Sequence, residues 1–167
     1  SVLRQRMFFV RMRTMVKNRV SGLLDRYPEL SRQRPWKDIF SQRGQSWLKQ
    51  LQVKEADRRV LDEDLELFEA LQERIAKSDS LVRELARGDR RVKILKTIPS
   101  IGDFFSVLIA YEVDDIRRFS SEKKFFSYIG IIPSTFSSGG RTFHGRLTKQ
   151  GNKYLRWAIV EANMAGY

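Results

Sequence analysis

Cysteine is absent from this 167-residue sequence, and histidine occurs once. Without cysteine the chain has neither a disulfide framework nor a thiolate metal site, and a single histidine excludes a multi-histidine site. No apolar run approaches the length of a membrane-spanning helix, and no signal-peptide pattern opens the chain. We therefore expect an intracellular protein that has no membrane partner and binds no cofactor through these residues.

Acidic residues are the minority charge. The chain has 32 Arg and Lys residues against 20 Asp and Glu residues, a net charge of +12 and an isoelectric point near 10.3. Residues 1–34 hold nine Arg and Lys against two acids, residues 117–156 hold nine against one, and residues 54–90 hold eight against eleven. Cations concentrated near both ends predict a polyanionic partner, DNA or RNA.

The spacing of apolar residues predicts a mainly α protein that begins with a long helical hairpin. Residues 1–26 have apolar residues at helical spacing. Residues 54–88 carry the clearest pattern, with an apolar residue at every seventh position: Leu61, Phe68, Ile75 and Val82. That seam is coiled-coil-like. We expect the two helices to pack antiparallel, within one chain or between subunits, in a helical region over residues 1–90.

Two details of this region have alternatives. Residues 36–51 are expected to form a short helix that is interrupted at Gly44, with Trp36 and Trp47 as core residues rather than base-stacking residues. The acidic run Asp62-Glu63-Asp64 has the residue types of a metal site. Because adjacent residues on a helix point to different faces, we expect this run to be a solvated face and no active site.

A pair of helices joined by a tight turn is predicted over residues 92–113. Val92 to Thr97 is helical in pattern, Ile98-Pro99-Ser100-Ile101-Gly102 turns the chain, and an apolar helix follows. The pattern is similar to a helix–hairpin–helix, whose turn holds a DNA phosphate through backbone amides, here at Ser100 and Gly102. Asp103 would oppose a phosphate, so a purely structural turn is the alternative.

The stretch over residues 133–151 combines hydroxyls, glycines and cations. Ser137 and Ser138 precede Gly139-Gly140, and the chain from Pro133 to Arg156 has no acid. Backbone amides and cations can seat a phosphate, and a hydroxyl held there is a possible nucleophile. The predicted DNA contacts are Arg141, His144, Arg146, Lys149, Lys153 and Arg156. A solvated basic loop is the alternative, and residues 131–148 are either an irregular loop or a hairpin that turns at Gly139-Gly140.

Capping residues predict the two helices that flank this stretch. Ser120 or Ser121 is expected to cap a helix that ends at Gly130, and Asn152 to cap a C-terminal helix over residues 152–166. Lys153 and Arg156 lie in the first turn of that last helix. The helix dipole disfavours cations there unless an anion binds, which is a second indication of a phosphate partner.

Spaced motifs over about half of the chain together resemble one family of mobile-element proteins. They are Ile98-Pro99-Ser100-Ile101-Gly102, Arg118-Phe119, Tyr128 to Pro133, Ser138-Gly139, and the glycine, Thr-Lys, Gly-Asn and Leu-Arg positions from Gly145 to Arg156. The pattern resembles the C-terminal transposase domain of the DEDD-type insertion-sequence transposases numbered one-ten, which include pilin-gene invertases and RNA-guided bridge recombinases. Ser100 departs from the family's glycine.

The resemblance implies a DNA transposase or recombinase whose C-terminal transposase domain spans residues 91–167. It places the nucleophilic serine for strand cleavage and exchange at Ser138. It further implies an acidic nuclease domain, absent from this chain, whose four carboxylates bind Mg²⁺, so this chain alone is expected to be inactive. Implied partners are DNA, as transposon ends and target, and a homo-oligomer through the long helix. A guide RNA is a further candidate, and the implied location is the prokaryotic cytoplasm, at the nucleoid.

Two other classes of function fit the residues. One is a non-catalytic helix–hairpin–helix module that binds nucleic acid and tolerates loss of Ser138. The other is a coiled-coil oligomerisation element organised by residues 54–88, with weak DNA binding. The complete open reading frame distinguishes them, because an upstream acidic domain supports the transposase and its absence favours the binding module.

Overall fold

The protein is mainly α, as predicted, and divides into two compact units, Ser1–Leu81 and Val82–Tyr167. A computed structural model describes residues 1–33, 37–138 and 141–164, without the side chains of residues 136–138, 141, 142, 144, 163 and 164. Among the described residues, no helix has the length and apolar character needed to cross a membrane.

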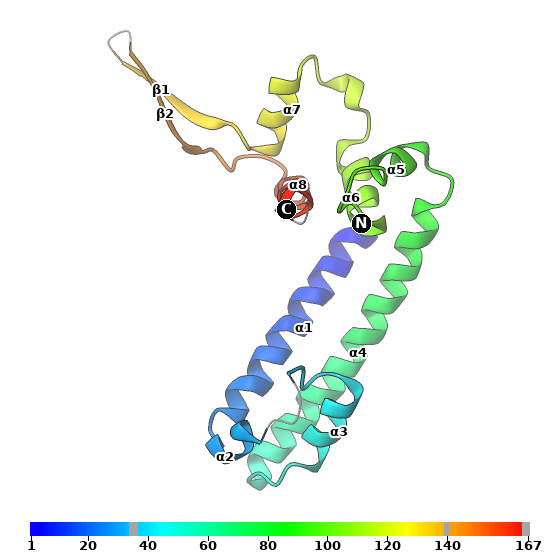
Figure 1. Ribbon diagram of the computed structural model, residues 1–167, viewed down its shortest axis with the longest axis vertical. Coiled ribbons are helices and arrows are strands. Elements are labelled where there is room, and N and C mark those ends of the chain that lie inside the picture. The colour runs from blue at the N-terminus through cyan, green and yellow to red at the C-terminus, as the bar shows by residue number, and fades with distance from the viewer. Residues whose placement is uncertain (34–36, 139–140, 165–167) are drawn as a thin grey trace. The chain divides into compact units, whose positions relative to one another are not determined.

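The first unit is a helical hairpin formed within one chain (Figure 1). Helix α1 (Val2–Leu24) and the long helix α4 (Glu55–Ala86), whose last residues belong to the second unit, run side by side in opposite directions. The short helices α2 (Pro28–Arg32) and α3 (Gln42–Gln50) lie in the connection between them. The predicted antiparallel pairing is therefore confirmed, and it is intramolecular.

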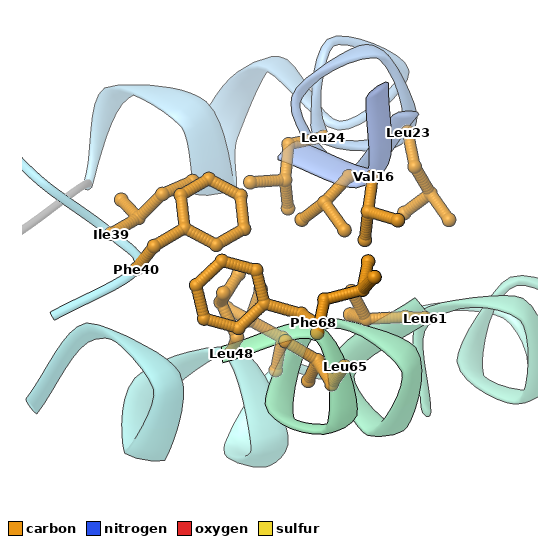
Figure 2. Packing of buried hydrophobic residues seen from close by; sticks show 12 residues of the cluster. Val16, Leu23, Leu24, Ile39, Phe40, Leu48, Leu61, Leu65 and Phe68 are labelled. Carbon is orange, nitrogen blue, oxygen red and sulfur yellow. The ribbon is translucent and has the colours of Figure 1, made fainter. Parts of the chain in front are cut away.

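The core of this unit lies between α1, α4 and the connection. Figure 2 shows Val16, Leu23 and Leu24 of α1 facing Leu61, Leu65 and Phe68 of α4, with Ile39, Phe40 and Leu48 beside them. The rings of Phe40 and Phe68 are 5.2 Å apart, and Lys17 Nζ lies 4.8 Å from the centre of the Phe40 ring. Trp47 packs half-buried against this core, as predicted, whereas Trp36 lies outside the described residues.

Three polar pairs cross from α1 to α4 along the hairpin, Arg6–Asp79, Arg13–Gln72 and Arg19–Asp64. A fourth pair, Arg26–Asp57, joins the residues just after α1 to the first turn of α4. The residue number rises along α1 while it falls along α4, as an antiparallel register requires. The closest atoms are 2.5 Å apart for Arg13 Nη1 and Gln72 Oε1, and 2.6 Å for Arg26 Nη2 and Asp57 Oδ1. The basic first helix and the acidic long helix therefore partly neutralise each other.

Two expectations for this unit were wrong. The acidic run is not wholly a solvated face, because the residue Asp64 is 3% exposed and lies in the seam between the helices. Gly44 does not interrupt a helix; it is buried inside α3, where its amide donates to Ser41 Oγ at 3.2 Å. A Cβ at Gly44 would lie 2.4 Å from the backbone of Ile39, so glycine lets the preceding loop approach the helix.

In the second unit, helices α5 (Arg90–Leu95) and α8 (Lys153–Met164) pack against α6 (Asp103–Val113). Helix α6 is apolar on most of its surface, and the buried residues of this unit include Val92, Val107, Leu108, Leu155 and Ala158. Trp157 of α8 meets the rings of Phe104 and Phe105 edge-on, at centroid distances of 6.2 and 5.1 Å. These three helices form the core of the second unit, and α7 contacts this core through α8.

A short 3-10 helix η1 (Ile116–Arg118) and helix α7 (Glu122–Ile129) follow, then strands β1 (Pro133–Ser138) and β2 (Arg141–Leu147). The predicted caps are confirmed. Ser121 Oγ accepts from the Lys124 amide, Gly130 ends α7 in the left-handed conformation, and Asn152 Oδ1 accepts from the amides of Tyr154 and Leu155. Of the two forms considered for residues 131–148, the hairpin is the one observed.

Candidate nucleic-acid interface

The candidate site is a two-stranded antiparallel ribbon formed by β1 and β2 (Figure 1). Its register places Ser138 opposite Arg141, Ser137 opposite Thr142, and Phe136 opposite Phe143. Residues alternate between the two faces of a strand. Ser138, Arg141 and Phe143 therefore lie on one face of the ribbon, and Ser137 lies on the other.

The structure describes only some of the predicted site residues in full. The side chains of Ser138, Arg141 and His144, and the turn residues Gly139 and Gly140, lie outside what it describes. The side chains of Arg146, Lys149 and Lys153 are exposed. Near the base of the ribbon, Ser134 Oγ donates to the Arg146 carbonyl at 3.0 Å, where the register shifts by one residue.

The base of the ribbon is held where two backbone segments cross. Lys149 N donates to the Gly130 carbonyl, and Asn152 N donates to the Tyr128 carbonyl, at 3.2 and 3.0 Å. Gly130 and Gly151 both have positive φ angles, +79° and +136°. A Cβ at Gly130 would lie 2.3 Å from the Gln150 carbonyl oxygen, and one at Gly151 would lie 2.3 Å from the Tyr128 carbonyl oxygen. Both positions therefore need glycine for conformation and for space.

Asn152 joins three helices through one polar network. Its Oδ1 caps α8, while its Nδ2 donates to Glu112 Oε2 of α6 at 2.6 Å and to the Tyr128 hydroxyl of α7 at 3.5 Å. The hydrogen bond from Asn152, with a further contribution from the Arg118 guanidinium, holds the pKa of Tyr128 below its ordinary value. Arg118 also stacks on the rings of Phe119 and Tyr128, at 4.6 and 4.7 Å.

Arg156 has a structural function that the sequence did not indicate. Its Nη1 donates to the carbonyls of Ile129 and Lys149, at 3.0 and 2.9 Å. Arg156 thereby links α8 to both of the backbone segments that cross at the base of the ribbon. The predicted DNA contact at Arg156 stays a prediction. The two carbonyl acceptors offset the conflict between the Arg156 cation and the helix dipole.

The charge of the second unit is concentrated around the ribbon. Residues 82–167 contain fifteen Arg and Lys residues and eight Asp and Glu residues. Seven of those cations lie in residues 123–160, which contain no acid, so the rest of the unit has eight of each sign and is neutral. Among the described side chains, Arg146, Lys149 and Lys153 form no ion pair, whereas Arg91, Lys96 and Arg117 do.

The turn between α5 and α6 has the backbone conformation that glycine favours. Ser100, which the resemblance aligns with a glycine, has a φ of +69°. Lys96 Nζ lies 2.6 Å from Asp103 Oδ1, so the carboxylate that opposes a phosphate is paired with a cation. The predicted phosphate contacts at Ser100 and Gly102 stay predictions.

An apolar groove of about 570 Å³ lies beside α6, lined by Ile94, Ile109, Val113, Ile116 and Phe125 among others. Arg91, Asp114, Asp115 and Arg117 also line it, and their charges are balanced within ion pairs. This groove is shaped for apolar groups. Arg146 on the ribbon and Lys149 and Lys153 just beyond it, which form no ion pair with the described acids, fit a polyanion better. The candidate interface is therefore the ribbon with its base.

Residues 92–167 match the model of the "Transposase IS116/IS110/IS902 family". The chain is 30% identical over 107 residues, or 64% of its length, to a Pseudomonas aeruginosa protein named "Probable family 20 transposase". It is 31% identical over 104 residues, 62% of its length, to the "Insertion element IS116 uncharacterized 44.8 kDa protein" of Streptomyces clavuligerus. It is 32% identical over 73 residues, 44% of its length, to the Yersinia enterocolitica "Transposase for insertion sequence element IS1328".

These similarities support the resemblance stated from the motifs, in its coarser form of a relation to insertion-sequence transposases. The matched regions cover 31%, 26% and 22% of the lengths of those three relatives. The chain thus spans less than a third of each. Among the described residues, no group of three or more His, Cys, Asp or Glu side chains is arranged to hold a metal ion.

Proposed function

We propose that this chain is the DNA-binding, nucleophile-bearing C-terminal part of an insertion-sequence transposase. The observation that carries the proposal is the position of Ser138. The resemblance places the family's serine-glycine pair at this residue, which lies opposite Arg141 at the end of the ribbon. The surrounding 38 residues, 123–160, contain seven cations and no acid. The match of residues 92–167 to a transposase family model supports the same function.

The chemistry follows from the residue types. Ser138 Oγ attacks the phosphorus of a DNA phosphodiester, its proton passes to a base, and the bond from phosphorus to one deoxyribose oxygen breaks as that oxygen takes up a proton. A hydroxyl of another strand then attacks the same phosphorus and releases the serine, so the strands are exchanged without loss of a phosphodiester. Arg141, Arg146 and Lys149 would stabilise the charge on the transferring phosphoryl group.

Serine is a weak nucleophile that a base or a metal ion must activate, and the described residues include no cluster of metal-ligating side chains. We propose an acidic, Mg²⁺-binding domain elsewhere in the full-length protein. Catalysis would then be shared between two domains, and this chain alone would be inactive. The homo-oligomer and the guide RNA stay predictions.

The test is the trapping of a covalent protein–DNA adduct by the full-length protein with Mg²⁺. Ser138→Ala should abolish the adduct and strand cleavage. Folding and DNA binding should be nearly unchanged, because a surface hydroxyl-to-hydrogen change usually alters stability by no more than about 0.5 kcal/mol.

Ser137→Ala is the matched control, because Ser137 lies one residue away on the opposite face of the ribbon. An adduct that persists in Ser138→Ala and disappears in Ser137→Ala would assign the chemistry to the other serine. An adduct that persists in both variants and in the double variant would remove the ribbon from the chemistry and favour a binding module.

A further inference from the structure

An aromatic side chain is exposed on the same face of the ribbon as the proposed nucleophile. Phe143 is 59% exposed, although phenylalanine is among the residues most often buried in proteins. It lies opposite Phe136 in the register, and both residues share the face that carries Ser138 and Arg141. The Phe143 ring forms no aromatic or cation–ring contact with the described side chains.

The distance along the ribbon matches the spacing of nucleotides. Phe143 lies two residues from Arg141, the partner of Ser138, and a strand rises about 3.4 Å per residue, which gives about 7 Å. Phosphates along one strand of B-DNA are spaced about 3.4 Å along the helix axis. If Ser138 holds a phosphate, Phe143 reaches bases within about two steps of it, since an unpaired strand can extend further per nucleotide than the rise of the duplex.

The charges beside Phe143 point to nucleic acid and not to protein as the occupant of this face. Arg146 and Lys149 are exposed, form no ion pair within the described residues, and belong to the acid-free stretch of residues 123–160. A two-stranded ribbon is narrow enough to enter the major groove of DNA. Aromatic side chains between such cations are the usual platform for unpaired bases.

We propose that Phe143 stacks on an unpaired DNA base within about two nucleotides of the phosphate that Ser138 attacks. The location of that phosphate rests on the proposed function, whereas the stacking itself does not. Phe143 would hold the strand in register for attack and favour DNA that is locally unpaired. Because every base presents a flat aromatic face, this contact selects for unpaired structure with little sequence preference.

The experiment compares two 20-base-pair duplexes that carry 2-aminopurine at the centre, one fully paired and one with a three-nucleotide central bubble. The protein should bind the bubble more tightly, with a change in 2-aminopurine fluorescence. Phe143→Ala should weaken binding to the bubble about 5- to 100-fold, abolish the fluorescence change, and leave duplex binding and the salt dependence of affinity as they are. Phe143→Trp should restore the preference for the bubble.

Leu147→Ala is the matched control, since Leu147 is also exposed and pairs with Pro133 at the other end of the ribbon. Equal weakening by Phe143→Ala and Leu147→Ala, or an unchanged fluorescence signal in Phe143→Ala, would overturn the proposal. So would a shift from dimer to monomer in Phe143→Ala with unchanged DNA affinity, which would make this face a protein interface. Performing the binding in the Ser138→Ala background keeps the result independent of the chemistry.

Discussion

At the scale of single residues, Asp64 is a carboxylate that the fold keeps from water. It lies between α1 and α4, and Arg19 Nε is 3.3 Å from its Oδ2 without the alignment of a hydrogen bond. Burial, which disfavours the charged form, raises the pKa of Asp64, and Arg19 only partly offsets this. An ionised buried group with an incomplete partner costs stability.

The raised pKa of Asp64 gives a signed dependence of stability on pH. In the folded state Asp64 keeps its proton to a higher pH than in the unfolded state. Its contribution to the free energy of unfolding therefore falls as the pH rises from about 4, the pKa of Asp in the unfolded chain, to the pKa of Asp64 in the folded protein. Asp64→Asn should therefore lose less stability than the wild type between pH 4 and pH 7, in urea unfolding measured across that range.

Asp62→Asn is the control, because Asp62 is half exposed and pairs with Arg58 on the outside of the same helix. This variant keeps the buried Asp64 carboxylate, so its profile should retain the fall in stability that Asp64 contributes over this pH range. Parallel profiles for Asp64→Asn and the wild type would show that the buried carboxylate does not titrate differently in the folded state.

At the scale of elements, the ribbon depends on the backbone crossing at its base. Gly151→Ala would bring a Cβ to 2.3 Å from the Tyr128 carbonyl oxygen and force a left-handed φ on alanine. We expect a loss of roughly 2 kcal/mol or more in local stability. Hydrogen exchange of the α7 and α8 amides should accelerate, while that of α1 should stay unchanged.

Gly88→Ala separates strain from steric overlap. Gly88 has a φ of +84° as well, but a Cβ there would meet no atom within 4 Å. It should therefore cost only the strain, of order 1 kcal/mol. If the two variants accelerate exchange to the same extent, close approach at the crossing does not stabilise the ribbon.

At the scale of the whole molecule, the cations on the ribbon and at its base should dominate binding to DNA. Alanine at Arg146, Lys149 and Lys153 together removes three charges that no described acid neutralises. If each contacts a phosphate, the slope of log affinity against log salt should become shallower by about 0.9 per contact, or roughly 2.7. Fluorescence anisotropy with a random-sequence duplex over a salt titration measures the slope.

A triple variant in the first unit, with alanine at Arg11, Arg74 and Lys77, removes the same number of exposed cations. It should change the slope far less. Equal changes in the two triple variants would mean that net charge alone drives binding, and an unchanged slope in the ribbon variant would place the DNA-binding surface elsewhere.

Local chemistry explains what the sequence could predict. The seven-residue seam predicted the long helix to within two residues at each end, and Ser121, Gly130 and Asn152 cap their helices as local preferences require. Features that depend on a distant partner were missed. Burial of Asp64 needs α1 beside it, and the two carbonyl bonds of Arg156 need a crossing that no periodicity records.

The sequence left residues 131–148 as either an irregular loop or a hairpin, because the local pattern there is weak. Residues 133–147 lack a clean alternation of apolar and polar residues, and the glycine pair is compatible with a loop or a turn. Its strands pair with each other and have little apolar surface to bury, so the pattern that normally identifies a strand is weak. The prediction of Ser138 as the nucleophile came from the resemblance to a family, whereas the register that places Phe143 on the same face required the structure.

The polar pairs that cross from α1 to α4 also constrain the length of the hairpin. Successive pairs, counting Arg26–Asp57 just beyond the end of α1, are six to eight residues apart along each segment, close to two helical turns. One inserted residue would rotate everything beyond it by about 100° and carry the next arginine away from its partner. An insertion or deletion between two pairs therefore keeps the pairs aligned only if about seven residues are added to, or removed from, both α1 and α4. Evolution can lengthen or shorten this hairpin only by changing two distant segments of the gene together.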